Sequence, residues 1–218
     1  MSLIAKANSG TDFEPIPAGM HHGICYGIID LGTQPGNPAL QYKAARKVAF
    51  LFELPEERIE LEREGRKVNL PRGLSSTYTL SLGKKSRLRP VLESWRGRAF
   101  TEAELEGFDL KNVLGANALL NLIHTVKGDK TYANISTISP LMKGTPKKTS
   151  ENPPVFFSLD DCGSKIVLPD SVPDWIKAKI MQSEEYIAEQ VRKGHPEPTD
   201  AEQANLAVVK DEEEDVPF

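Results

Sequence analysis

Apolar and polar residues alternate along several short stretches of the chain, a pattern typical of strands that bury one face. The clearest example is Leu74–Leu82, in which tyrosine and leucine alternate with threonine and serine. Stretches of this kind, rich in β-branched and aromatic residues, are expected to be strands. They are Met20–Leu31, Lys43–Leu54, Leu74–Leu82, Ala118–Val126 and Tyr132–Ile138.

Turn and loop signals bound these expected strands. Pro, Gly and Asn in Gly32–Leu40 indicate a loop after the first strand, and Pro55 should close the second. Lys127–Lys130 has the composition of a tight turn between the last two strands. Ser139–Pro154 is rich in Pro, Gly, Thr and Lys, so it is expected to be a linker or a mobile loop.

Three further segments have weaker patterns. Glu56–Lys67 is highly charged, but Ile59 and Leu61 alternate with charged neighbours, which fits a long hairpin arm and also allows a helix. Val155–Leu168 is expected to form one more hairpin. Met1–Pro17 is polar and irregular and should form an arm.

Helical spacing predicts a helix within Lys84–Arg98. Its apolar residues recur at i, i+4 and i+7, so one stripe would face a core. They are Leu88, Leu92 and Trp95. Ser86 can cap the start of this helix, and Gly97 can end it.

Three more helical segments follow. Thr101–Glu104 has the sequence of a capping box, so a short helix should begin there and end at Gly107. Asp109–Leu114 should add one turn. Pro173–Lys193 is expected to be one helix, ended by Gly194, with one apolar stripe. The residues of that stripe are Trp175, Ile176, Ile180, Ile187 and Val191.

The order of these elements predicts the fold class. Three strands, a helical connection and two more strands are typical of a five-stranded Greek-key barrel of the OB type, in a mainly β chain with some helix. A sandwich and an open α+β sheet are the competing interpretations. The expected parts are an N-terminal arm (1–17), the barrel domain (18–168), a C-terminal helix (169–194) and an acidic tail (195–218). The tail is rich in Pro, Glu and Asp and is expected to be disordered.

Charge is distributed unevenly along the chain, whose formal net charge is −4. Residues 1–150 carry a net charge of +6, and residues 151–218 carry −10. Within Lys84–Arg98, six basic residues stand against one acid. An ordinary solvated helix face would explain such a run, but surface helices usually mix both signs. A basic body with an acidic tail favours an anionic ligand for the body.

Several protein classes find no support in the sequence. The chain has no apolar run of about 18 residues or more, and Met1–Gly10 lacks a signal-peptide pattern, so we expect a cytoplasmic protein. Cys25 and Cys162 are isolated and should be reduced and buried. The chain has no Gly-rich phosphate loop, no Gly-x-Ser-x-Gly motif and no histidines at metal-ligand spacing. Neither an enzyme nor a metal or cofactor site is therefore predicted.

Cations interleaved with aromatic residues favour a single-stranded nucleic acid, because phosphates need cations and bases stack on rings. Phe50 and Phe52 share one strand face and are expected in the core, and Trp95 could also belong there because it continues an apolar stripe. The candidate DNA contacts are Lys43, Arg46, Lys47, Tyr78, Lys84, Lys85, Arg87, Arg89, Trp95, Arg96, Arg98, Lys127, Lys130 and Tyr132.

The end of the chain is the most specific signal. The acidic run Asp211–Asp215 is followed by Val216, Pro217 and Phe218. This end resembles the tail of bacterial single-stranded DNA-binding proteins, which ends in Asp-Ile-Pro-Phe after acidic residues, with Val216 in place of the isoleucine. The resemblance implies that the tip docks replication and repair proteins, with the Phe in an apolar pocket and the carboxylates on a basic rim. The tip residues are Asp215, Val216, Pro217 and Phe218.

The body is similar to the OB-fold single-stranded DNA-binding proteins of tailed bacteriophages over residues 13–160. The similarity implies a non-enzymatic protein that coats and protects single strands during phage replication or recombination, in the cytoplasm of the host bacterium. Assembly of several copies is compatible with this role. The motifs that carry the similarity are Pro17–Gly19, Tyr26, Ile29–Gln34, Arg46–Val48, Tyr78–Leu82, Trp95–Arg98, Gly107–Leu110 and Tyr132–Ile135.

Three other functions fit parts of the pattern. An RNA-binding OB protein would use the same cations and rings. A metal-dependent nuclease would need a carboxylate cluster, for which Asp30, Glu53 and Asp109 are the candidates. An adaptor would use the basic body to bind an acidic protein.

Overall fold

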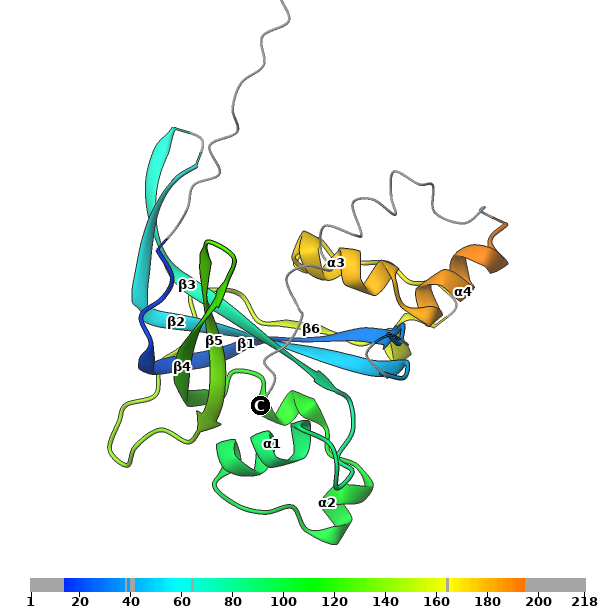
Figure 1. The fold of residues 1–218 in the computed structure, drawn as a ribbon, viewed down its shortest axis with the longest axis horizontal. Coiled ribbons are helices and arrows are strands. Elements are labelled where there is room, and N and C mark those ends of the chain that lie inside the picture. Colours follow the sequence, from blue (N-terminus) through cyan, green and yellow to red (C-terminus); the bar gives the residue numbers. More distant parts are fainter. Residues whose placement is uncertain (1–13, 38, 40–41, 64, 164, 195–218) are drawn as a thin grey trace, which may run out of the picture.

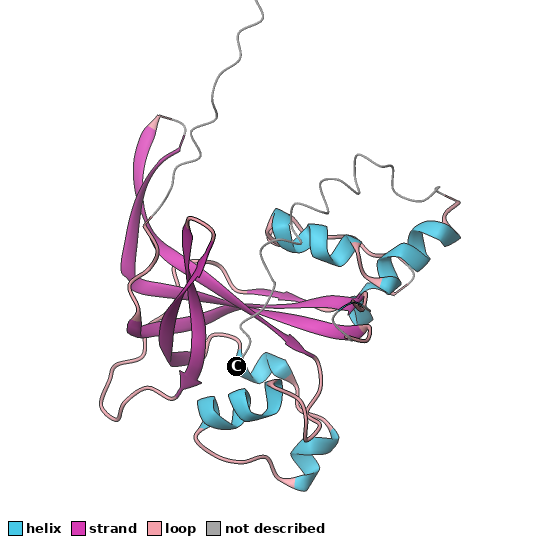
Figure 2. Cartoon of the chain, in the orientation of Figure 1, coloured by secondary structure: helices cyan, strands magenta, loops and turns pink. Residues whose placement is uncertain are grey.

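The computed structural model describes residues 14–37, 39, 42–63, 65–163 and 165–194. Its centre is a strongly curled antiparallel sheet of long strands, with one group of helices below the sheet and another to its right in Figure 1. The fold is therefore mainly β with a few short helices (Figure 2). None of the helices in the described ranges is long and apolar enough to cross a membrane.

The five long strands have the spatial order β3-β2-β1-β4-β5, and all neighbours are antiparallel. A short sixth strand, β6 (Val155–Phe157), pairs in parallel with β1. The five predicted strands are thus confirmed. Their bounds are β1 Gly19–Gln34, β2 Ala45–Arg63, β3 Arg66–Thr79, β4 Asn117–Lys127 and β5 Lys130–Ser139.

The sheet curls around β1, which pairs with β4 along its first part and with β2 along the rest. Close packing on this strand requires a residue without a side chain at Gly27. A Cβ atom placed there would lie 2.7 Å from Leu51 Cδ1 and 2.9 Å from Leu51 Cβ, on the neighbouring strand. A larger residue would therefore force β2 away from β1.

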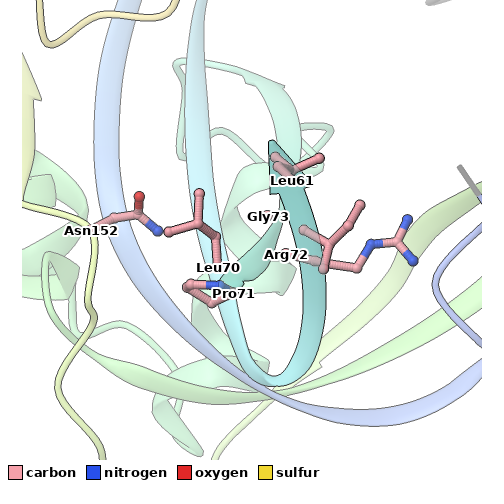
Figure 3. Close-up of a pocket in the computed structure, with 7 residues that line it drawn as sticks. Leu61, Leu70, Pro71, Arg72, Gly73 and Asn152 are labelled. Atoms are coloured by element: carbon pink, nitrogen blue, oxygen red, sulfur yellow. The ribbon is translucent and has the colours of Figure 1, made fainter. Parts of the chain in front are cut away.

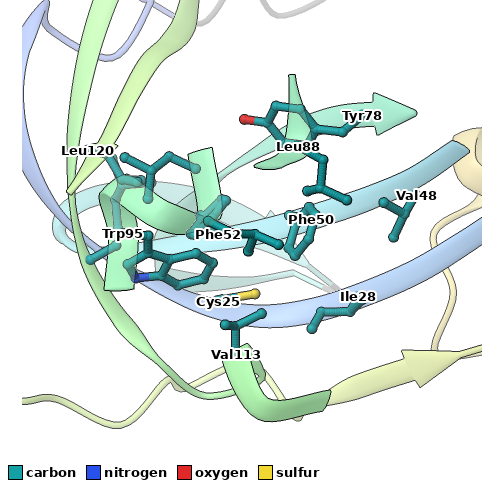
Figure 4. Close-up of a cluster of buried hydrophobic side chains, with 14 of the residues drawn as sticks. Cys25, Ile28, Val48, Phe50, Phe52, Tyr78, Leu88, Trp95, Val113 and Leu120 are labelled. Atoms are coloured by element: carbon teal, nitrogen blue, oxygen red, sulfur yellow. The ribbon is translucent and has the colours of Figure 1, made fainter. Parts of the chain in front are cut away.

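Two apolar clusters lie on opposite sides of the sheet. The inner cluster fills the curl and includes Phe50, Phe52 and Leu88 (Figure 4). The outer cluster lies on the other face of β1 and β2, beneath β6 and the C-terminal helices, and includes Ala49 and Leu51. Consecutive residues of β2 alternate between the two clusters, as the pleat of a strand requires.

The connection between β3 and β4 agrees with the sequence prediction. Helix α1 (Leu88–Arg96) buries the predicted stripe and ends at Gly97, whose φ of 69° is in the left-handed region. Helix α2 (Glu102–Glu106) begins with the predicted capping box. A 3-10 turn, η2 (Leu110–Val113), follows before β4.

Several predicted boundaries in the first half are wrong, including those of the third strand, which spans Arg66–Thr79 and not Leu74–Leu82. Pro55 does not close the second strand, because β2 continues past it and forms the hairpin arm with β3. The pairing of β2 with β3 shifts register between Leu54 and Arg58, and such a bulge accommodates a residue that lacks an N–H group. The loop predicted at Gly32–Leu40 begins later, since β1 extends to Gln34.

The single helix predicted at Pro173–Lys193 is also wrong. The chain forms two helices, α3 (Asp174–Met181) and α4 (Glu184–Arg192). Ser183 separates them, because its hydroxyl accepts a hydrogen bond of 3.2 Å from the Tyr186 amide and caps the start of α4.

Two related expectations for the C-terminal half also fail. Val155–Leu168 does not form a hairpin, since it contributes only β6 and the 3-10 turn η3 (Leu159–Cys162). Ile176 and Ile180 are fully buried, but the break between the helices removes the continuous stripe. The exposed members of the predicted stripe are Trp175, Ile187 and Val191.

Residues 14–17, the part of the predicted N-terminal arm that the structure describes, pack against the sheet. Ile16 is buried in the inner cluster. His124 Nε2 on β4 lies 2.8 Å from the Ile16 carbonyl oxygen, which holds this segment against the sheet. The rest of the predicted arm, residues 1–13, lies outside the described residues.

Candidate nucleic-acid interface

Two of the predicted aromatic contacts lie inside the curled sheet (Figure 4). The Tyr78 ring packs edge-on against Phe50, with 5.8 Å between the ring centroids. Trp95 packs against Phe50 and Phe52, and its Nε1 donates a hydrogen bond of 3.0 Å to the Asn117 carbonyl. Tyr78 is 8% exposed and Trp95 is 5% exposed, so neither ring can stack on a base. Their assignment as DNA contacts is therefore corrected.

The Arg46 guanidinium is paired with two acids. Its guanidinium donates to Asp30 at 3.2 Å and to Asp160 at 2.8 Å. Asp30 also accepts the amides of Gly32 and Leu159, at 2.9 and 3.1 Å. The hydrogen bond to Asp30 is the main cause that raises the pKa of Arg46. Arg46 therefore joins β1, β2 and η3, and it is removed from the set of phosphate contacts.

Three more arginines of the predicted set are paired with acids around α1. Arg89 donates to Glu93 at 3.1 Å, one helical turn away. Arg96 and Arg98 both bind Glu104, and the two Arg98 bonds measure 2.7 and 2.9 Å. The pKa of Glu104 is lowered to about 2. The main cause is its hydrogen bond from Arg98, followed by the bonds from the Thr101 backbone amide and from Arg96. These acids offset the positive charge, so α1 does not present the predicted row of unpaired cations.

The other predicted cations near α1 gather at one end of the β2–β3 ladder. Lys47 lies opposite Thr79, the last residue of β3, and the chain runs directly from there towards α1. The Leu80 amide donates a hydrogen bond of 2.8 Å to the Arg46 carbonyl, which holds this connection against β2. We call this group the basic end. Its five residues form no ion pair within the described ranges: Lys43, Lys47, Lys84, Lys85 and Arg87.

The remaining predicted contacts belong to the β4–β5 hairpin. Lys127 and Lys130 flank the predicted tight turn, which is confirmed, and Tyr132 is half-buried on β5. In Figure 1 this turn and the tip of the β2–β3 arm lie on the upper side of the sheet, away from α1. The structure therefore does not bring these three residues together with the basic end.

The outer face of β3 runs between the basic end and the arm and carries small side chains. Leu74 and Tyr78 pack towards the inner cluster, and Ser76 between them bonds the Tyr78 hydroxyl, so the alternate residues of β3 point outward. Among the described strands, β3 forms a ladder only with β2. We call the outward residues the small row, which consists of Gly73, Ser75, Thr77 and Thr79.

Two adjoining pockets hollow the surface beside the small row, and Gly73 lines both. The first measures about 350 Å³ and lies against the hairpin arm (Figure 3). The second measures about 310 Å³ and lies between the sheet and the start of α3. The other residues of the first are Ile59, Leu61, Leu70, Pro71, Arg72 and Asn152. The other residues of the second are Tyr26, Leu51, Leu74, Ser75, Pro173 and Trp175.

The two aromatic rings of the second pocket, Tyr26 and Trp175, are not among the predicted contacts. Strand alternation assigns Tyr26 to the face of Ile28, but a bulge between Cys25 and Gly27 turns it to the outer cluster. Helical spacing places Trp175 in the predicted buried stripe. It immediately precedes the buried Ile176, and adjacent helix residues point about 100° apart, so this spacing could have indicated its exposure.

The three candidate nuclease carboxylates have separate structural partners. Asp30 binds Arg46, as described above, and Asp109 accepts the Lys111 amide at 2.8 Å as the cap of η2. Glu53 is fully buried and accepts the amides of Glu151 and Asn152 at 2.9 and 2.8 Å. Within the described ranges, no group of three or more His, Cys, Asp or Glu residues is placed to hold a metal ion. The three carboxylates therefore do not form the cluster that the nuclease alternative would need.

No family model, curated protein or solved structure matches the chain. The predicted docking tip and the rest of residues 195–218 lie outside the described residues. The tip residues concerned are Asp215, Val216, Pro217 and Phe218.

Proposed function

We propose that the protein is a single-stranded DNA-binding protein built on a barrel of the OB type. The strand order, the approach of β3 to β5 and the position of α1 between β3 and β4 all support this assignment. OB folds are five-stranded, partly open Greek-key barrels that bind oligonucleotides on the face of strands 2 and 3 and in the loops beside it. In this protein the corresponding face carries the small row and ends at the basic end.

The observation that carries the proposal is the basic end. Its five cations have no acidic partner within the described ranges, so they are available to phosphates. The small row continues from Thr79 along the same strand and lets an extended backbone approach the sheet closely. Cations along a groove hold a strand independently of its sequence, which suits a protein that coats and protects exposed single strands during replication or recombination.

The first prediction concerns lysines of the basic end. Replacing Lys47, Lys84 and Lys85 together by Ala should weaken binding to an oligothymidylate by about 100-fold at 0.1 M salt. Each lost phosphate contact reduces the slope of log K against log salt by about 0.7 for a single strand, so the slope should become shallower by about 2. Fluorescence anisotropy titrations at several salt concentrations measure both quantities.

A matched control removes the same amount of charge elsewhere. Lys143, Lys147 and Lys165 are exposed and form no ion pair within the described residues. Their joint replacement by Ala should change the slope by much less. Equal losses in the two triple variants would mean that net charge, and not the basic end, governs binding.

The same titrations separate the rival functions. We expect tighter binding to single-stranded DNA than to a duplex of the same sequence. An RNA strand that binds more tightly than its DNA counterpart would favour the RNA-binding alternative. Shortening of labelled DNA in the presence of Mg²⁺ or Mn²⁺ would favour a nuclease.

The second prediction concerns recruitment of partners by the acidic tip, which we propose from its sequence. A labelled peptide of residues 209–218 should bind a replication or repair enzyme that recognises the bacterial Asp-Ile-Pro-Phe tail. Phe218→Ala should weaken this binding by about 10- to 100-fold, because a buried Phe contributes about 1.5–3 kcal/mol. In the whole protein this change should leave affinity for DNA nearly unaltered, since the acidic residues remain. Equal binding of both peptides would contradict docking by the tip.

A further inference from the structure

The pocket between the sheet and α3 has an uncharged lining with two aromatic rings. Tyr26 and Trp175 contribute the rings, Ser75 contributes a hydroxyl group, and the other lining residues are apolar or Gly. Trp175 is 38% exposed, although a ring of this size is usually well buried. The volume of this pocket, about 310 Å³, is at the lower end of the usual range for small-ligand pockets. These properties suit one flat, uncharged group with polar edges.

The tryptophan is held in place by a well-anchored helix. The next residue, Ile176, is fully buried in the outer cluster. The Lys179 ammonium lies 5.3 Å from the Trp175 ring centroid. The Lys179 carbonyl accepts a hydrogen bond of 3.0 Å from Gln34 on β1. Because α3 is fixed to the sheet on this side, the ring is already oriented before a ligand arrives.

Tyr26 contributes the second ring of the pocket, and this ring is neutral. Burial of the Tyr26 side chain is the main cause that raises the pKa of its hydroxyl, and the nearby Glu53 carboxylate raises it further. The phenol therefore keeps its proton at neutral pH and can donate a hydrogen bond. Two acids near this end of α3, Asp170 and Asp174, lie 3.9 and 3.5 Å from the Lys177 ammonium, which offsets part of their negative charge.

The neighbouring pocket supplies a positive charge. Arg72 lines it and forms no ion pair within the described part of the chain. Gly73, which has no side chain, lines both pockets. The uncharged pocket and the Arg72 cation thus lie on either side of Gly73. The pocket matches the base of a nucleotide, and the cation matches its phosphate.

We propose that the Tyr26–Trp175 pocket binds one unstacked base of a DNA single strand, with Arg72 contacting an adjacent phosphate. This inference rests on the proposed function and adds that the C-terminal helices form one wall of the DNA site. An apolar segment of a protein would use the rings but would leave Arg72 without a partner, so the base is the better match. Stacking on an aromatic ring contributes about 1–3 kcal/mol per base, whatever the base.

Tryptophan fluorescence tests the contact directly, because the two tryptophans differ in exposure. Adding an oligothymidylate longer than one OB site, about 4–16 nucleotides, should quench the emission of the wild-type protein. Trp175→Phe should remove most of this quenching, since Trp95 is buried. Trp175→Ala should weaken binding by about 5- to 150-fold. The matched control is Val191→Ala, an exposed apolar residue on α4 that lines neither pocket.

A second variant blocks the pocket instead of removing its wall. A Cβ atom at Gly73 would meet its nearest neighbours at 3.5 and 3.9 Å, which is ordinary contact, so Gly73→Leu should fold and extend its side chain towards the pockets. It should weaken binding at least tenfold. Gly107→Leu is the control, because the backbone there is extended and a Cβ would meet nothing within 4 Å.

The outcomes separate this inference from the proposed function. If the wild-type protein binds no single-stranded DNA, the proposed function fails. If it binds but its emission is unquenched, and if folded Trp175→Ala and Gly73→Leu variants keep wild-type affinity, the base pocket alone is disproved. Circular dichroism and thermal melting of each variant establish that it is folded.

Discussion

Replacing Trp95 by Ala should lower the free energy of unfolding by about 3–5 kcal/mol, the cost of truncating a large aromatic side chain in a core. The Trp95 ring packs 5.5 Å from the Phe52 ring and 6.4 Å from the Phe50 ring, between centroids. Its truncation removes these contacts, leaves a cavity where α1 meets the sheet, and deprives the Asn117 carbonyl of its donor. A typical domain has only about 5–15 kcal/mol of stability, so much of the folded state could be lost.

The other tryptophan provides the control. Trp175→Ala should cost less than about 1 kcal/mol, because a half-exposed side chain loses little packing. Urea denaturation of the three proteins, followed by circular dichroism, measures the difference. Similar costs for the two variants would mean that Trp95 is not a core residue. The pair also separates structure from binding, since only the Trp175 variant should remain folded while losing affinity for DNA.

Replacing Asp30 by Ala should cost about 3 kcal/mol, the lower end of the range for removing one partner of a buried ion pair. The Asp30 side chain is 7% exposed, and it accepts bonds from Arg46 and from two backbone amides. Its loss leaves those amides without their acceptor and removes a connection between β1 and η3. The cost stays near the lower end because the Arg46 side chain is 31% exposed and can be hydrated.

The matched control is the other acid that binds Arg46. Asp160 is 74% exposed, and such surface pairs contribute only about 0–1 kcal/mol. Asp160→Ala should therefore change the free energy of unfolding by less than about 1 kcal/mol. Urea denaturation measures both variants. If Asp30→Ala proved as mild as Asp160→Ala, the Asp30 network would have no structural role.

Elements with strong local signals were predictable from the sequence. The stripe of α1, its glycine end and the capping box of α2 depend on residues three to seven positions apart. The β4–β5 turn depends on adjacent residues. Such patterns act within a single element, so neighbouring residues determine them whatever the rest of the chain does.

Interruptions inside long elements were less visible. Pro55 predicted the end of a strand, but pairing with β3 extends β2 past it through a bulge. The bulge at Tyr26 moves that ring to the opposite face of the sheet. The capping bond of Ser183 divides one expected helix into two. In each case a hydrogen bond or a strand pairing outweighs the simple periodicity.

The candidate site depended most on tertiary structure. The sequence by itself indicated a mainly β chain with a basic body, and five of its predicted cations do gather at one end of a sheet face. It could not indicate that Asp160 would bind Arg46. Nor could it indicate that Trp175 would stand beside Gly73 across the surface of the sheet. The partners of a charge or a ring come from segments distant in sequence, and only the folded chain brings these segments together.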